Sequence, residues 1–343
     1  MTDTSKVLLH VDGLRVRLDL EEGSIHPVRD VSCVVHEGET LGIVGESGSG
    51  KSVFALSMLG LVPIPPARIE QGRVLFRGRD LLRASPAELR AIRGGEIGFI
   101  FQDPMSALNP VLTIGRQIME PLRRHLKLSR AAARARAVEL LDLVGIRDPH
   151  RCMDQYIHQL SGGMRQRVMI AIGVSCTPKL LIADEPTTAL DVTIQAQILE
   201  LVQDLKAKLG MAMIWISHDL GVVAGLADTV QVMYAGCVLE RGPVDAIFGD
   251  PRNAYTLGLL QSMPPRDGTT GHRLTPIRGQ PPNPFDLPKG DPFAPRNPFA
   301  TPRCHVEMPP LVQVADGAEG HLCAAFYDLR TAPRSDDTEA ACA

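Results

Sequence analysis

A glycine-rich stretch, Gly45-Glu-Ser-Gly-Ser-Gly-Lys-Ser52, carries the most specific chemistry in the chain. It follows a short apolar run, Thr40–Val44, and opens a segment of helical composition, which is the context that a phosphate-binding loop needs. The glycines allow backbone N–H groups to point inward around phosphates, and the helix adds its positive end. The alternative is a glycine-rich turn that matches the pattern by chance.

Within this loop, we expect Lys51 to reach the β- and γ-phosphates of a nucleotide and the Ser52 hydroxyl to coordinate Mg²⁺. The backbone of the loop would surround the phosphates. The residues that we assign to it are Gly45, Glu46, Ser47, Gly48, Ser49, Gly50, Lys51 and Ser52.

Two acids, Asp184 and Glu185, follow the apolar run Leu180–Ala183. Ligands of parallel sheets bind at the carboxyl ends of the strands. We expect Asp184 to hold Mg²⁺, directly or through water, and Glu185 to polarise the water that attacks the γ-phosphate. The alternative is a pair of surface acids that begins a turn before Pro186.

Three further positions combine polar chemistry with the end of an expected element. Ser161-Gly-Gly precedes a helical segment and predicts an N-cap followed by N–H groups that can bind an anion, although a plain helix cap is the commoner use. Gln102 and His218 each follow an apolar strand. Taken alone, Gln102 also fits an ordinary turn, and a single histidine at such a place is more often structural.

The pattern of elements predicts an α/β fold. Alternating sequence at Val7–Leu18 indicates a half-buried strand, whereas the unbroken apolar runs later in the chain indicate a parallel sheet covered on both faces. Further expected strands are Val28–Val35, Arg73–Phe76, Ile97–Phe101, Ala212–Ser217 and Val230–Tyr234.

Helices are expected through most of the segment 106–157 and again at Ile194–Leu209, which Gly210 ends. The clearest lies within Ser129–Val144, with Ser129 as N-cap and Gly145 at its end. From Met263 to Pro310 the chain is crowded with proline and glycine, so we expect an irregular or extended segment there.

Composition limits the class of protein. The 343 residues carry a net charge of −3, from 36 basic and 39 acidic side chains, which argues against nucleic acid as a partner. Neither a signal peptide nor a run of about 20 apolar residues is present, so we expect a cytosolic chain. Seven scattered cysteines fit reduced thiols rather than a disulfide framework.

The segment Leu160-Ser-Gly-Gly-Met-Arg-Gln-Arg167 resembles the signature sequence of ATP-binding-cassette ATPases. Other motifs of that family follow the expected order: Phe101-Gln-Asp-Pro, Asp184-Glu-Pro, Ala189-Leu-Asp191 and Ile216-Ser-His-Asp. The resemblance implies a P-loop NTPase (RecA-like) core with an antiparallel β subdomain and an inserted helical subdomain. It divides the chain into a cassette over residues 1–262, with its helical subdomain at about 106–175, an extension over 263–330, and a tail at 331–343 for which we expect disorder.

The resemblance also implies roles for the remaining polar positions. Ser161, Gly162 and Gly163 would bind the γ-phosphate of ATP held by another subunit, so that two ATP molecules are sandwiched in a head-to-tail dimer. Gln102 would be a ligand of Mg²⁺ and water, and His218 would form a hydrogen bond to the γ-phosphate. Asp191 would lie in the dimer-contact loop, and it also fits a simple N-cap of the following helix.

The wording of these motifs, together with Asn253-Ala-Tyr-Thr-Leu-Gly-Leu-Leu260 and the proline-rich extension, resembles the dipeptide/oligopeptide permease ATPases of bacteria. Relatives of that branch carry nickel or other small solutes. The resemblance implies an importer with two membrane-spanning permease subunits and an external solute-binding protein. It favours a different ATPase subunit over a second copy of this chain as the partner, and it puts the chain at the cytoplasmic face of the inner membrane.

One departure from this branch concerns metal binding. Members often carry four cysteines in the extension, and some bind an iron–sulfur cluster there. Asp291 and Asn297 stand at the first two of these positions, so only Cys304 and Cys323 remain. Since such clusters need about four thiolates, we expect no iron–sulfur cluster.

Two alternatives from other classes share the same motifs. A soluble ATPase of this fold would act in DNA repair or on ribosomes, but the segment between Lys51 and Ser161 is too short for the coiled coils of repair proteins, and the chain holds one cassette rather than two. A regulatory cassette would bind ATP without hydrolysing it. The presence of Glu185 and His218 argues against that reading.

The second departure generates a prediction about base selectivity. Family members usually place an aromatic residue near Leu18 to stack on adenine, whereas leucine offers apolar contact that does not distinguish one purine from another. We expect comparable turnover of ATP and GTP, measured as kcat/KM for each nucleotide. A strong preference for ATP would contradict this expectation.

Overall fold

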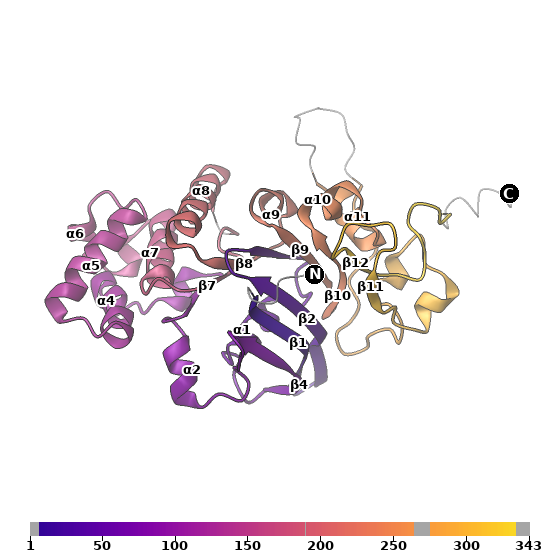
Figure 1. Ribbon diagram of the computed structural model, residues 1–343, viewed down its shortest axis with the longest axis horizontal. Coiled ribbons are helices and arrows are strands. Elements are labelled where there is room, and N and C mark those ends of the chain that lie inside the picture. The colour runs from indigo at the N-terminus through magenta and orange to yellow at the C-terminus, as the bar shows by residue number, and fades with distance from the viewer. Residues whose placement is uncertain (1–6, 189, 264–274, 334–343) are drawn as a thin grey trace. The chain divides into compact units, whose positions relative to one another are not determined.

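The computed structural model describes residues 7–188, 190–263 and 275–333 (Figure 1). The disorder expected for the end of the tail falls on residues 334–343, which lie outside this range, as does Ala189. The described chain divides into two compact units that interleave along the sequence. Unit 1 comprises Met1–Leu9, Val34–Thr40 and Leu75–Ser217, and unit 2 comprises His10–Cys33, Leu41–Val74 and His218–Ala343.

Unit 1 contains three parallel strands, β6 (Ile97–Ile100), β7 (Leu180–Asp184) and β8 (Ala212–Ser217). All residues of β7 and β8 are buried. Strands buried on both faces need apolar side chains at nearly every position, which is why these runs do not alternate. The polar residues, Asp184 and Ser217, stand at the carboxyl ends of the two strands. The connections between the strands are helical, and α7 (Gly162–Val174) packs against β6.

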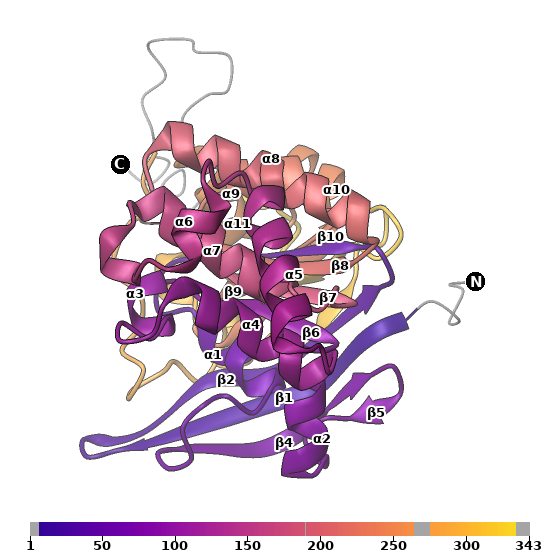
Figure 2. The same cartoon turned by 90° about the vertical axis from the view of Figure 1, so that its left-hand side faces the viewer.

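Unit 1 also contains a cluster of helices, which faces the viewer in Figure 2. It is formed by α4 (Ile114–His125), α5 (Arg130–Leu143), α6 (Pro149–Met153) and α7, with the shorter α3 (Pro104–Ala107) and the 3-10 turn Ile157–Gln159. Ser129 caps α5 as expected, accepting a hydrogen bond from the Ala132 N–H at 3.2 Å. Unit 1 also contains α2 (Pro86–Ile92) and the long helix α8 (Val192–Leu209), which Gly210 ends.

Unit 2 contains most of the hairpin β1 (Val7–Leu20) and β2 (Gly23–His36) and of β4 (Ala67–Phe76), in the order β2-β1-β4. The last residues of β4 and the short β5 (Arg79–Asp80) pair antiparallel within unit 1. Sequence analysis predicted β1 and β2, but of β4 it found only the last part, Arg73–Phe76. The first half carries Glu70, Gln71 and Gly72, whose types do not favour a strand.

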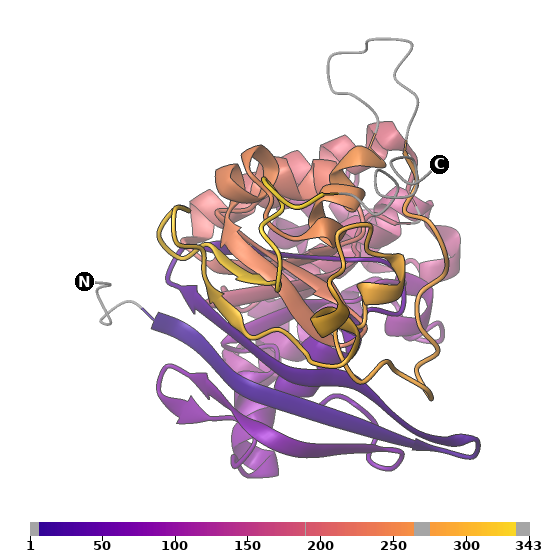
Figure 3. The ribbon, with the colours of Figure 1, turned by 90° about the vertical axis from the view of Figure 1, so that its right-hand side faces the viewer.

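The second sheet of unit 2 has the order β11-β12-β10-β9-β3. Strands β3 (Thr40–Val44) and β9 (Thr229–Tyr234) are parallel, and β10 (Cys237–Pro243), β12 (Leu322–Ala324) and β11 (Leu311–Gln313) follow antiparallel (Figure 3). The helices of this unit are α1 (Lys51–Met58), α9 (Leu220–Leu226), α10 (Val244–Gly249) and α11 (Ala254–Gln261).

The proline-rich segment, expected to be irregular, has two short 3-10 turns, Ala294–Arg296 and Pro302–His305, and no longer helix among its described residues. It is nevertheless well packed. Phe293 joins Tyr234 and Tyr255 in an aromatic cluster with ring centroids 4.6 to 5.4 Å apart. Arg296 of this segment donates a hydrogen bond to the Tyr234 hydroxyl of β9 at 3.1 Å. This segment therefore shares the core of unit 2.

No helix among the described residues is long and apolar enough to cross a lipid bilayer. The described cysteines, at positions 33, 152, 176, 237, 304 and 323, are all buried and free of disulfide bonds.

A buried acid also ties the C-terminal segment to β10. Glu240 is fully buried and accepts hydrogen bonds from the Arg252 N–H at 2.6 Å and the Asn253 N–H at 3.1 Å, and its Oε1 lies 2.8 Å from His321 Nε2. Removal of the carboxylate would leave several buried polar groups without their acceptor.

We therefore expect Glu240→Ala to lower the free energy of unfolding by about 3 kcal/mol in urea denaturation. Glu307, an exposed acid paired with Arg303 in the same segment, provides the matched control. Glu307→Ala should change stability by less than about 1 kcal/mol. Equal effects of the two substitutions would show that the buried acid contributes no more than a surface pair.

Candidate nucleotide site

The loop after β3 has the backbone geometry of a phosphate cradle. Gly45 has φ 152° and Gly50 has φ 98°, and at both positions a side chain would collide with backbone. A Cβ on Gly45 would lie 2.1 Å from the carbonyl oxygen of Met233, and one on Gly50 would lie 1.9 Å from that of Pro27. Because only glycine fits, β2 and β9 fix the path of the loop from outside.

Lys51, the first residue of α1, is 4% exposed. Its Nζ donates hydrogen bonds to the carbonyl oxygens of Gly45 at 2.8 Å and Glu46 at 3.0 Å, and to Ser49 Oγ at 3.3 Å. The ammonium is therefore held inside the loop by the loop's own oxygens, and phosphate oxygens can replace these acceptors. Ser52 follows in the first turn of α1.

In unit 1, the two predicted acids lie at the end of β7. Asp184 is the last residue of the strand and is 5% exposed, and Glu185 adopts φ 44° just beyond it. The Glu185 N–H donates to the carbonyl oxygen of Ile216 on the neighbouring strand at 3.0 Å. A left-handed backbone conformation is costly for glutamate, and this hydrogen bond helps to hold it. The Glu185 side chain therefore leaves the direction that it would have if the strand continued.

The Glu185 carboxylate has two side-chain donors. Gln102 Nε2 donates to Glu185 Oε2 at 3.3 Å, and the Thr188 hydroxyl donates to the same oxygen at 2.9 Å. The structure thus brings together two residues predicted from separate motifs. Thr188 was not singled out from the sequence, although its place in the turn after Glu185 is the signal that could have identified it.

The signature segment forms the start of α7. Ser161 caps this helix by accepting a hydrogen bond from the Met164 N–H at 3.4 Å, and Gly162 and Gly163 lie in the first turn. Ser161 and Gly162 are exposed at the surface. Asp191 caps α8, accepting from the Ile194 N–H at 3.0 Å, as predicted.

Two predicted residues lie elsewhere in unit 2. Leu18 is half-buried near the end of β1. His218 is exposed directly after the end of β8.

The four positions discussed for an iron–sulfur cluster are all buried: Asp291, Asn297, Cys304 and Cys323. Burial raises the pKa of the Asp291 carboxyl to about 6 and also raises the pKa of the Cys323 thiol. Among the residues that the structure describes, no group of three or more His, Cys, Asp or Glu side chains is arranged to hold a metal ion. The expectation that this chain carries no cluster stays a prediction.

Comparisons with known proteins identify the family. A family model described as "ABC transporter" matches residues 28–188, and one described as "Oligopeptide/dipeptide transporter, C-terminal region" matches residues 239–304. The oligopeptide transport ATP-binding protein OppD of Bacillus subtilis is 52% identical over 309 residues, covering 90% of this chain and 86% of the relative.

This chain belongs to the ABC transporter ATPases. Other relatives are the dipeptide transport ATP-binding proteins DppD of Bacillus subtilis, 53% identical over 85% of this chain and 87% of the relative, and of Escherichia coli, 49% identical over 91% and 95%. The resemblance drawn from the motifs, the cassette fold and the ATPase activity that it implied are thereby confirmed.

Solved structures agree with this assignment. The ATP-binding cassette MJ0796, in a dimeric post-hydrolysis state bound to ADP and Pi, is 28% identical and has a TM-score of 0.62. The match covers 69% of this chain and 98% of that one.

The geometry of the loop generates a prediction with an internal control. Gly50→Ala should weaken ATP binding at least tenfold, because the new Cβ would displace the loop from β2 and from the start of α1 (about 1.4 kcal/mol for each tenfold). Gly48 has a similar φ of 78° but nothing within 4 Å of an added Cβ. Gly48→Ala should therefore destabilise the loop conformation by only about 1 kcal/mol, which is the backbone strain of a non-glycine residue at positive φ. Calorimetric titration with ATP compares the two, and equal losses would contradict the steric argument.

Proposed function

We propose that this chain is the ATP-hydrolysing subunit of a bacterial importer that takes up peptides or a related small solute. The observation that carries the substrate class is the C-terminal region match, taken with relatives named as oligopeptide and dipeptide transport proteins. These relatives match over 86% and 87% of their length, and the second family model reaches residue 304, so the likeness includes part of the extension as well as the cassette.

In this proposal the loop residues Gly45–Ser52 bind the phosphates of ATP. Lys51 exchanges its bonds to the Gly45 and Glu46 carbonyls for bonds to the β- and γ-phosphates. Leu18 contacts the base through apolar surface alone. The tight backbone of the loop supports this role, since its path is set before nucleotide arrives and little order has to be gained on binding.

Mg²⁺ would be held by Ser52, Gln102 and Asp184. The donor set fits this ion, because Mg²⁺ prefers oxygen ligands and is usually bound through one or two carboxylates plus phosphate oxygens and water. When bound, the ion would neutralise charge that develops on the phosphates.

Glu185 is the proposed general base or water-positioning residue. The bonds from Gln102 and Thr188 orient its carboxylate, which would accept a proton from the attacking water. His218 would donate a hydrogen bond to the γ-phosphate. The roles of Gln102 and Glu185 are linked, because a change in the amide position alters the hydrogen bonding of the carboxylate.

Hydrolysis would require a second ATPase subunit. Ser161, Gly162 and Gly163 at the exposed start of α7 would bind the γ-phosphate of ATP held on that partner, through the cap hydroxyl and the helix N–H groups. The dimeric cassettes among similar structures support a two-subunit arrangement. We propose a different ATPase subunit, rather than a second copy of this chain, as the physiological partner.

The remaining partners would be two transmembrane permease subunits and an external solute-binding protein, with this chain at the cytoplasmic face of the inner membrane. We propose a cassette over residues 1–262, whose helical subdomain at about 106–175 contacts the permeases, and an extension over 263–330. Nucleic acid has no role in this proposal, in keeping with the net charge of −3.

Substitution of Glu185 tests the hydrolytic role. Glu185→Gln should keep ATP affinity within about twofold and lower kcat at least a hundredfold, because the amide cannot accept the proton from water (general-base catalysis contributes about 10² to 10⁴). The matched control is Glu200→Gln, an exposed acid on α8, which should leave kcat unchanged. Retained turnover in Glu185→Gln would remove this residue from the mechanism.

The same variant tests the sandwich. With hydrolysis blocked, ATP should increase crosslinking between the Lys51 loop of one subunit and the Ser161 end of α7 in another, in this chain alone or with its partner subunit. Mass spectrometry of the crosslinked peptides identifies the two segments. No increase with ATP in either pairing would contradict the proposed dimer.

A further inference from the structure

An arginine of the C-terminal region contacts the phosphate-binding loop directly. Arg296 lies at the end of the 3-10 turn Ala294–Arg296. Its Nη1 donates to Glu46 Oε2 at 2.6 Å, and its Nη2 donates to Glu46 Oε1 at 3.1 Å. Both residues belong to unit 2. A bidentate pair of this kind fixes the orientation of both side chains, not only their distance.

The guanidinium is held in place by its surroundings as well as by Glu46. Arg296 Nε donates to the carbonyl oxygen of Arg278 at 2.9 Å, and Nη1 also donates to the Tyr234 hydroxyl at 3.1 Å. The guanidinium carbon lies 5.8 Å from the ring centroids of Tyr234 and Phe293. The Arg296 side chain is only 6% exposed, against 27% for that of Glu46. Arg296 is therefore a preorganised donor aimed at the loop.

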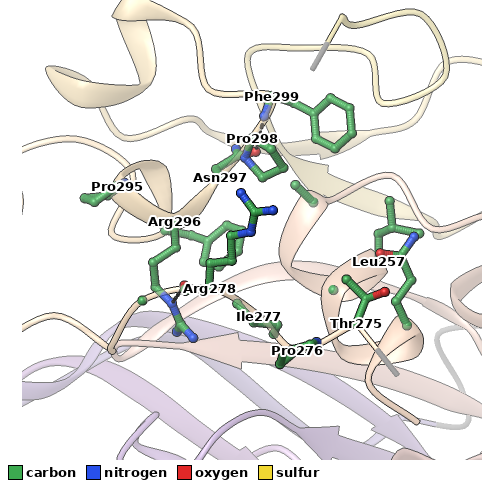
Figure 4. A pocket seen from close by; sticks show the side chains of 15 residues that line it. Leu257, Thr275, Pro276, Ile277, Arg278, Pro295, Arg296, Asn297, Pro298 and Phe299 are labelled. Carbon is green, nitrogen blue, oxygen red and sulfur yellow. Dashed lines mark hydrogen bonds between the residues drawn. The ribbon is translucent and has the colours of Figure 1, made fainter. Parts of the chain in front are cut away.

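Arg296 also forms part of the wall of a pocket of about 410 Å³, together with Leu257, Ile277, Phe293 and Phe299 (Figure 4). The wall also carries polar side chains, among them Thr275, Arg278 and Asn297. The guanidinium has few water molecules around it, because the Arg296 side chain is only 6% exposed, and this strengthens its attraction to the Glu46 carboxylate.

Glu46 is bonded through its backbone as well. Its N–H donates to the Tyr255 hydroxyl of α11 at 2.8 Å, and its carbonyl oxygen accepts from Lys51 Nζ at 3.0 Å. The Glu46 N–H therefore points toward α11 and donates to Tyr255 rather than to a phosphate. One residue of the loop therefore connects α11 and Arg296 on one side with the phosphate-binding lysine on the other.

The negative charge of Glu46 bears on how the loop binds phosphates. A carboxylate in a loop that binds a polyanion repels the phosphates, and it also offers the Lys51 ammonium a competing partner. Neutralisation by a fixed guanidinium removes both effects. Without Arg296 the loop would carry one uncompensated negative charge close to the phosphates.

We infer that Arg296 is a positioning residue of the nucleotide site, which neutralises Glu46 and so couples the C-terminal region to the affinity of the loop for ATP. The inference rests on the proposed use of Gly45–Ser52 for ATP. It assigns to the C-terminal region a role in nucleotide binding that is separate from any contact with permease subunits.

The test compares ATP dissociation constants of the full-length chain and four variants by calorimetric titration. Arg296→Gln should weaken ATP binding roughly threefold to tenfold, because it leaves the Glu46 charge uncompensated. Arg296→Lys should retain most of the affinity. Glu46→Gln alone should not weaken binding, and Arg296→Gln combined with Glu46→Gln should return to within about twofold of the unaltered chain, because the repelling charge is then absent.

The rescue separates charge compensation from a merely structural role, since removing a second partner does not repair lost packing. The control is Arg303→Ala, which removes an exposed ion pair with Glu307 in the same region and should leave ATP affinity unchanged. Unaltered affinity in Arg296→Gln would overturn the inference, and so would a double variant as weak as Arg296→Gln. If Arg296→Gln does not fold, Arg296→Met with and without Glu46→Gln applies the same criterion. Failure of the unaltered chain to bind ATP would overturn the proposed function together with this inference.

Discussion

The structure depends first on a loop whose backbone must turn inward around an anion while its outside lies directly against other strands. Met233 and Pro27 leave no room for a side chain at Gly45 and Gly50. The glycines therefore serve two purposes, because they permit unusual backbone angles and they permit close contact with neighbouring backbone. A phosphate site made of backbone N–H groups is precise only when its supports are rigid, and here those supports are sheet strands.

The two acids after β7 are positioned in a different way from the loop. Asp184 continues a buried strand, whereas Glu185 leaves it through a left-handed conformation held by the Ile216 carbonyl. Two adjacent acids thereby receive different surroundings, one buried at the strand end and the other held by Gln102 and Thr188. Differences of environment between neighbouring carboxylates are how one type of side chain can bind a cation and also accept a proton.

The chain that follows α11 is also held in place by specific contacts within unit 2. It adds β12 beside β10, contributes Phe293 to an aromatic cluster, and brings Arg296 to the loop. An irregular, proline-rich segment can be this well ordered because its buried polar groups are bonded and its rings are packed, which offsets the conformational entropy that such a chain loses. The extension is in this respect part of unit 2 and not an appendage.

The sequence by itself determined the family, the glycine pattern of the loop after β3, the place of the two acids after β7 and the caps of α5, α7 and α8, because each is a local pattern whose residues are consecutive or a few positions apart. It also predicted most buried strands, since a continuous apolar run needs no knowledge of its neighbours. Only the tertiary structure decided that Gln102 and Thr188 share one oxygen of Glu185, and that Tyr255 and Arg296 meet Glu46. Glu46 and Arg296 are 250 positions apart, and no periodicity or spacing encodes a contact at that separation. It arises when β9, α11 and the extension pack into one core, which is a property of the folded chain and not of any segment.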